Sequence, residues 1–185
     1  IIGDMISSRI FIEEFACLYN DNLLNVVGLH YKDYSEWMRE RDLSEQRRYW
    51  NDEFQGEIPK VTIPKDYNSR EIHSYTGKTF ALKTSDSFKN TIRECVHKYG
   101  ITEYMLFLAG FMITVSRYGC SEEVVIGSPV SGRVHNDTER MLGLFVNTLA
   151  MRGRPEKDKI CSEFIMEIKE SCLKAYENQE YPFER

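Results

Sequence analysis

The chain has 185 residues, of which 42% are hydrophobic and 29% are charged, and it carries a formal net charge of -5. These values belong to a globular protein that is long enough to bury a core, and they exclude a disordered segment. The acidic balance, without any basic block, argues against nucleic acid or an anionic membrane as the main partner. The longest apolar segment, 104–115, is too short to cross a bilayer, and no signal peptide is expected.

The first third of the chain predicts the end of a strand, two helices and a linker. Residues 1–2 are an apolar stub, and Asp4 lies at the corner between this stub and a helix that begins near Ser7 or Ser8. One apolar face of this helix is predicted, formed by Ile10, Phe11, Glu14, Phe15 and Leu18. A polar helix with aromatic anchors is predicted over 35–54. Residues 59–70, which contain two prolines, are the best linker candidate.

Strand and helix signals alternate beyond this linker. Residues 74–83 alternate in polarity like a strand. Ser85 caps a helix that Gly100 closes, and Thr102 begins another helix that is apolar on nearly every side. An amphipathic helix is predicted over 156–179. This alternation predicts an α/β or α+β fold, a two-layer sandwich in which helices back a mixed sheet.

The segment 124–152 contains glycine bends, an arginine and an asparagine that the packing of a core does not require. An apolar run opens it and breaks at a Gly-Ser-Pro bend, a Ser-Gly-Arg turn follows, and a second strand-like run covers 144–151. The glycines and the proline are expected to shape the backbone. The special residues of this segment are Gly127, Ser128, Pro129, Gly132, Arg133 and Asn147.

Two charged residues far apart in the sequence are the candidates for a structural ion pair. Asp4 is either a helix cap or a buried carboxylate that pairs with a distant cation and fixes a loop. Arg133 is the obvious cation, because a planar guanidinium can meet a carboxylate bidentately; the alternative is a solvated surface arginine. Asn147 either satisfies a neighbouring backbone group or contacts a substrate.

The cysteines and histidines predict no metal site. The five cysteines are widely spaced, form no CxxC pair, and are interpreted as reduced thiols of a cytoplasmic protein. The four histidines show no ligand spacing. The cysteines are Cys17, Cys95, Cys120, Cys161 and Cys172.

Five motifs in order resemble the condensation domains of nonribosomal peptide synthetases. The segment IGSPVSGR at 126–133 and the segment GLFVNTLAMR at 143–152 resemble two paired motifs of that family. YKDYSEW at 31–37, followed by Gln46 and a Tyr-Trp pair, is similar to a third. YPFE at 181–184 resembles a fourth, and IIGDM at the start resembles the tail of the HHxxxDG active-site motif.

The resemblance implies a chloramphenicol-acetyltransferase-like fold with two lobes. Residues 1–58 would then form the end of the first lobe and a connecting helix, 59–70 the linker, and 71–185 most of the second lobe. The chain would be the middle of such a domain, and both ends look cut.

The resemblance also implies roles for individual residues. The two motif histidines would lie immediately before Ile1, and the second would orient the attacking amine or take its proton. Asp4 would be structural and would pair with Arg133. Met5 stands where the family usually has glycine and would narrow the substrate tunnel. The implied substrate and tunnel residues are Met5, Gly127, Ser128, Pro129, Gly132 and Asn147.

The implied reaction forms an amide bond between groups held on phosphopantetheine arms, with no metal or other cofactor bound directly. The implied partners are donor and acceptor peptidyl carrier proteins and the neighbouring adenylation domain. Without its histidines the 185-residue piece is expected to be inactive and to self-associate through exposed surface. A heterocyclising relative, an ester-forming relative and a degenerate domain that only docks carrier proteins stay open as alternatives.

Overall fold

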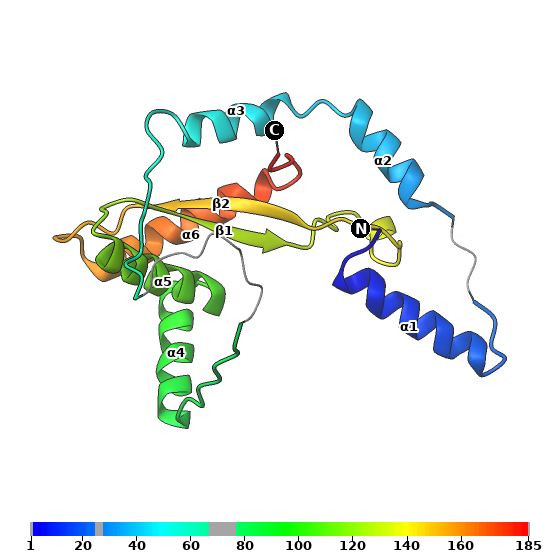
Figure 1. Ribbon diagram of the computed structural model, residues 1–185, viewed down its shortest axis with the longest axis horizontal. Helices are drawn as coiled ribbons and strands as arrows, with labels where there is room; N and C mark the ends of the chain where they lie inside the picture. Colours follow the sequence, from blue (N-terminus) through cyan, green and yellow to red (C-terminus); the bar gives the residue numbers. More distant parts are fainter. Residues whose placement is uncertain (1, 25–27, 67–76, 185) are drawn as a thin grey trace. The chain divides into compact units, whose positions relative to one another are not determined.

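The computed structural model describes residues 2–24, 28–66 and 77–184, and it contains helices and a small sheet (Figure 1). The chain divides into two compact units. The first unit comprises Ile1–Gln55, Gly127–Ala150 and Ala175–Arg185, and the second comprises Gly56–Ile126 and Met151–Lys174. Each unit therefore contains segments that are far apart in the sequence, and the two predicted lobes stay a prediction.

Helix α1 (Met5–Tyr19) opens the first unit. It begins earlier than the predicted start near Ser7, because the Asp4 side chain accepts a hydrogen bond from the Ser7 N–H and caps the helix. Of the apolar stub, the structure describes Ile2, which lies outside any strand, so the predicted strand end is wrong for that residue. The predicted apolar face is also mostly exposed, as at Phe11 and Phe15.

The single helix predicted over 35–54 is two helices, α2 (Tyr31–Glu40) and α3 (Ser44–Glu53). The chain becomes extended at Arg41, and the Asp42 carboxylate accepts a hydrogen bond from the Ser44 N–H at 2.9 Å. A side chain that bonds to the backbone two residues later competes with continued helix, which explains the break.

The second unit contains α4 (Asp86–Tyr99) and α5 (Glu103–Gly119). The predicted start and end of α4 and the predicted start of α5 are confirmed. Ser85 and Thr102 both cap with their hydroxyl oxygens, and Gly100 closes α4 in the left-handed conformation. Helix α5 supplies part of the core of this unit. The buried core side chains of the unit include Met105, Leu108, Met112, Val115, Val124, Met151, Phe164 and Ile168.

Strands β1 (Val124–Val130) and β2 (Asn147–Gly153) pair in the sheet that the described residues form. The predicted break at the Gly-Ser-Pro bend is wrong, because β1 continues through Pro129. β1 is hydrogen-bonded only to β2 in this sheet, and an edge strand tolerates a residue without an N–H. The strand predicted over 74–83 is absent from 77–83, and 74–76 lie outside the described residues.

The last helix, α6 (Cys161–Glu177), is shorter than the predicted 156–179. Residues before it form a turn, in which the Lys159 N–H donates to the Glu156 carbonyl and the Lys159 ammonium donates to the Arg154 carbonyl. A short 3-10 helix, η1 (Asn136–Thr138), lies between the two strands in the sequence. The predicted linker has neither helix nor strand over 59–66; its remaining residues, 67–70, lie outside the described part.

Within the described ranges, no single helix has both the length and the hydropathy needed to cross a membrane. Helices α4 and α5 meet those criteria only as a pair bent by 102°, and only by length and composition.

The turn after β1 requires glycine at position 132. Gly132 has φ +65°, which L-residues with a side chain rarely adopt, and a Cβ there would lie 1.9 Å from the Phe145 carbonyl oxygen. The turn therefore presses directly against the backbone that precedes β2.

Gly132→Ala is expected to lower the free energy of unfolding by at least about 2 kcal/mol, because alanine disfavours this φ and its methyl group would clash with the Phe145 backbone. Gly110→Ala is the control: a Cβ at this helical position meets nothing within 4 Å, so that variant should be neutral or gain about 0.5–1 kcal/mol. Chemical denaturation measures both. Equal stability of the two variants would contradict the account of this turn.

Candidate functional site

The centre of the first unit is a buried ion pair between Asp4 and Arg133. The Arg133 Nη2 lies 3.1 Å from Asp4 Oδ1 and 3.3 Å from Asp4 Oδ2. Both side chains are almost fully buried, with 3% of Arg133 and 2% of Asp4 exposed. The structure thus brings together two predicted site residues that are separated by 129 positions, and Asp4 is both a helix cap and an ion-pair partner.

The geometry differs from the two-pronged pairing that the sequence suggested. A single nitrogen of Arg133, Nη2, meets both carboxylate oxygens. The other terminal nitrogen, Nη1, donates to the carbonyl of Met141 at 2.8 Å and to the carbonyl of Thr138. The guanidinium therefore connects the helix cap to the last residue of η1 and to the segment that follows η1. Its carbon also lies 4.1 Å from the centre of the Phe145 ring, within cation–π distance.

The Asp4 carboxylate receives enough hydrogen bonds to stay ionised. Burial by itself raises its pKa, but hydrogen bonds from Ser7, Arg133 and the Phe145 N–H outweigh burial and hold the pKa below the ordinary 3.8. The stabilisation by this group is therefore complete above pH 3.8 and is lost as the pH falls through the lower pKa of the folded state. At neutral pH the pair is fixed in its charged form.

A serine that the sequence reasoning missed completes this site. The buried Ser7 hydroxyl accepts hydrogen bonds from Arg133 Nη2 and from the Gly143 N–H, both at 3.0 Å, and donates to the Gly143 carbonyl at 2.7 Å. Its position three residues after a capping aspartate is the only sequence signal, and that signal does not reveal a contact with Gly143.

Aromatic rings of α2 pack against the same segment. Tyr31 and Tyr34 lie with ring centroids 5.1 Å and 4.8 Å from that of Phe145. The Tyr31 hydroxyl donates to the Leu144 carbonyl at 2.8 Å. Gly143 makes this approach possible, because a Cβ there would lie 2.1 Å from the Tyr31 ring. The strand-like run predicted over 144–151 begins only at 147 because its first residues serve these contacts.

Asn147 uses all four of its hydrogen-bonding positions on the backbone. Its amide nitrogen donates to the carbonyls of Gln179 at 2.7 Å and Tyr181 at 2.8 Å. Its amide oxygen accepts from the Thr148 N–H and from the Phe183 N–H. The side chain thus holds the segment that contains the YPFE motif, and its predicted contact with substrate stays a prediction.

Glu180 in the same segment is held by two side chains, Arg41 and His135. It accepts from the Arg41 guanidinium and lies 3.1 Å from His135 Nε2. Burial raises the pKa of Glu180, but hydrogen bonds and charge from Arg41 and His135 hold it below its ordinary value. Trp50 adds a third contact, since its indole N–H donates to the Asn178 carbonyl at 3.0 Å.

The remaining predicted tunnel residues are dispersed. The Met5 side chain at the first position of α1 is 85% exposed. Gly127 and Pro129 are exposed on β1, whereas Ser128 between them is buried. Their predicted contact with a substrate tunnel stays a prediction. Two of the predicted residues adjoin the ion pair in the sequence, since Met5 follows Asp4 and Gly132 precedes Arg133.

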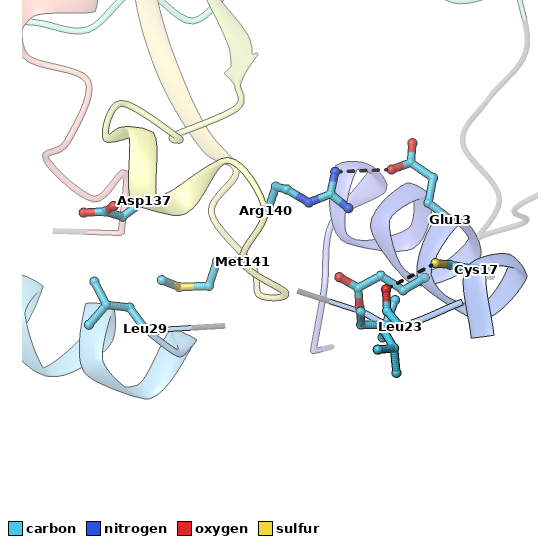
Figure 2. Close-up of a pocket in the computed structure, with 10 residues that line it drawn as sticks. Glu13, Cys17, Leu23, Leu29, Asp137, Arg140 and Met141 are labelled. Atoms are coloured by element: carbon cyan, nitrogen blue, oxygen red, sulfur yellow. Dashed lines mark hydrogen bonds and ion pairs between the residues drawn. The ribbon is translucent and has the colours of Figure 1, made fainter. Parts of the chain in front are cut away.

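A pocket of about 360 Å³ lies on the first unit, beside α1 (Figure 2). Its lining joins apolar side chains to charged ones, and across it Arg140 pairs with Glu13 at 3.6 Å. In the described part of the chain no three His, Cys, Asp or Glu side chains group as metal ligands. The labelled lining residues are Glu13, Cys17, Leu23, Leu29, Asp137, Arg140 and Met141.

Comparison with known proteins identifies the family. The family model described as "Condensation domain" matches residues 1–185. The chain belongs to the condensation domain family.

The curated relatives are synthetases, and the chain spans only a small part of their length. It is 37% identical over 188 residues to tyrocidine synthase 2 of Brevibacillus parabrevis. This alignment covers 100% of the chain and 5% of the synthase. It is 38% identical to bacitracin synthase 3 of Bacillus licheniformis over 100% of the chain and 3% of that protein.

Solved structures show the fold. The chain superposes on the X-domain in its complex with OxyB from teicoplanin biosynthesis with a TM-score of 0.87 and 24% identity. It superposes on the first condensation domain of the calcium-dependent antibiotic synthetase, bound to substrate analogue 2a, with a TM-score of 0.75 and 16% identity. Each comparison covers 100% of this chain and 44% of the other. The α/β fold with a chloramphenicol-acetyltransferase-like architecture is thereby confirmed.

Arg133→Lys is expected to lower the free energy of unfolding by about 2 kcal/mol or more, because a lysine ammonium lacks the planar fork that reaches the buried Asp4 carboxylate and two carbonyls together. Arg9→Lys is the matched control, since Arg9 pairs with Glu13 at 3.6 Å on the surface with 71% of its side chain exposed. That control should change stability by less than about 0.5 kcal/mol. Urea denaturation at pH 7 compares them, and an Arg133→Lys variant as stable as its control would refute the pair's structural role.

Asn147→Asp is expected to destabilise the domain by about 2 kcal/mol or more, because a carboxylate would face the Gln179 and Tyr181 carbonyls without a proton to donate. Asn51→Asp is the control, at an exposed position of α3, and it should be close to neutral. Thermal unfolding gives the difference. Limited proteolysis adds a local readout, since cleavage within 179–183 should accelerate only in the Asn147 variant. Unchanged cleavage would contradict the role of Asn147 in holding this segment.

Proposed function

We propose that this chain is the central part of a condensation domain that forms an amide bond between two carrier-bound substrates. The amine of an aminoacyl group attacks the thioester carbonyl of an upstream acyl or peptidyl group. A C–N bond forms, the C–S bond breaks, the amine loses a proton, and the donor arm leaves as a thiol. The observation that carries this proposal is the family match over the whole chain.

The proposed role of Asp4 and Arg133 is to hold the active-site loop rather than to exchange protons. By resemblance, the reacting histidine lies immediately before Ile1, so its backbone continues into the Asp4 cap. Hydrogen bonds keep Asp4 ionised, and an arginine stays charged at any physiological pH. A pair that does not titrate can fix the position of a neighbouring base throughout the reaction.

The proposed substrates arrive on phosphopantetheine arms of a donor and an acceptor carrier protein, and an adenylation domain of the same synthetase is the proposed neighbour. Met5 projects from the start of α1 with 85% of its side chain exposed, which supports its proposed place at the wall of the substrate tunnel. Its bulk, where the family usually has glycine, would narrow that tunnel.

The second candidate function is a non-catalytic domain that only docks carrier proteins, and Met5 is the observation that favours it. The residues that precede Ile1 in the full protein separate the possibilities. Two histidines favour amide or ester formation, two aspartates favour heterocyclisation, and neither pair favours docking alone.

The complete domain is expected to transfer a peptidyl group between two loaded carrier proteins, and the 185-residue chain alone is expected to transfer none, because it lacks the histidine. Mass spectrometry of the acceptor carrier protein measures the product. A complete domain with Met5→Gly is the matched variant, and faster turnover there would support the narrowed tunnel. If the complete domain and its Met5→Gly variant were both inactive with two loaded carrier proteins, the proposed amide-forming function would be wrong. The non-catalytic docking function would then be favoured.

A further inference from the structure

The Ser7 hydroxyl joins three segments of the first unit at one atom. One hydroxyl offers one donor and two acceptor positions. Ser7 Oγ accepts from Arg133 Nη2 and from the Gly143 N–H and donates to the Gly143 carbonyl, so all three positions are used. The side chain is buried on α1, and both of its partners lie more than 120 residues away in the sequence.

Neighbouring Ser8 shows that this arrangement is particular to Ser7. The Ser8 hydroxyl is exposed and donates to the Asp4 carbonyl at 3.1 Å, which is an ordinary bond within its own helix. The Ser7 hydroxyl instead bonds to groups outside its own helix, namely Arg133 and the Gly143 backbone before β2. Removing its hydroxyl would leave the Gly143 N–H and carbonyl buried without this partner.

The contacts around Ser7 form a closed ring of interactions. Ser7 bonds to Gly143, the Phe145 N–H donates to Asp4 Oδ2 at 3.3 Å, and Asp4 accepts from both Arg133 and the Ser7 N–H. The Phe145 ring lies against the same guanidinium. The orientation of the Asp4 carboxylate is therefore set by the 143–145 segment as well as by Arg133, and Ser7 connects the two.

We propose that Ser7 is a positioning residue of the condensation site, whose hydroxyl locks the Asp4–Arg133 pair to the Gly143 backbone. This role rests on the proposed function, because it acts on the loop that carries the reacting histidine. Ser7 touches no reacting atom. It fixes the angle at which the cap of α1 presents that loop, so its loss lowers the rate of the chemical step and leaves substrate binding unchanged.

The test compares Ser7→Ala, Ser7→Thr and Ser8→Ala in the complete condensation domain. Hydrogen exchange by mass spectrometry, on a peptide covering 141–146, reports the Gly143 amide. That amide is expected to be slow in the wild type and about tenfold faster in Ser7→Ala alone. Ser7→Thr keeps a hydroxyl and should restore slow exchange. Ile10→Val, at a buried position of the same helix, controls for lost stability without touching these hydrogen bonds.

Kinetics of peptidyl transfer complete the test. In Ser7→Ala, kcat per folded domain is expected to fall about tenfold with KM unchanged. Ser7→Thr should recover most of the rate, and Ser8→Ala and Ile10→Val should match the wild type. A fast Gly143 amide in the wild type, or a Ser7→Ala domain with full kcat, would overturn the role of Ser7 while the proposed function stands. An inactive wild-type domain would instead overturn the proposed function, and the role of Ser7 in the reaction with it.

Discussion

The constraint on which the rest of this structure depends is the burial of a carboxylate and a guanidinium together. Removing two charges from water costs several kcal/mol for each ion unless further hydrogen bonds satisfy both groups. The chain meets most of this requirement with main-chain groups, although the buried Arg133 Nε has no hydrogen-bond partner in the described part of the chain. Asp4 accepts from the N–H groups of Ser7 and Phe145, and Arg133 donates to the carbonyls of Thr138 and Met141. Residues 4–7 and 133–145 are thereby joined, and each segment supplies hydrogen-bonding groups to the ion pair.

Around this pair, the motifs that mark the family are parts of one structural network in the first unit. The aromatic residues of α2 support Phe145, which lies against the guanidinium. Asn147 and Trp50 bond to the backbone of the segment that ends in YPFE, and Glu180 of that segment pairs with Arg41. Five stretches that are scattered along the sequence thus become neighbours. Their residue types suit hydrogen bonding to backbone at close approach, which explains why glycine and tyrosine recur among them.

The parts of the fold that the sequence predicted are those that local chemistry decides. The caps at Ser85 and Thr102 and the left-handed Gly100 need only nearby residues, and all three are confirmed. The split between α2 and α3 was missed because the helical pattern continues through Arg41, whereas the Asp42 side chain favours a new start at Ser44. Predictions that depend on distant partners fared worse. A strand over 74–83 would need a neighbouring strand to pair with, and no strand forms over 77–83. The apolar face of α1 would need a packing partner, and Phe11 and Phe15 on it are exposed.

The same distinction holds at the candidate site. The residue types of Asp4 and Arg133 suggested a pair, because a planar guanidinium suits a carboxylate, and the family resemblance supported it. The manner of pairing could not be predicted, since it depends on where the Thr138 and Met141 carbonyls lie. Ser7 was missed because its partner, Gly143, is 136 residues away and a serine in the first turn of a helix is ordinary.

A double-mutant cycle on the ion pair tests the central claim most directly. The free energies of unfolding of Asp4→Asn, Arg133→Met and the double variant are compared with that of the unchanged protein at pH 7. The account predicts a coupling energy of about 2 kcal/mol or more, because each single change strands a buried charged or polar partner that the double change removes. A coupling energy near zero, with additive losses, would show that the two side chains act independently and would contradict the account.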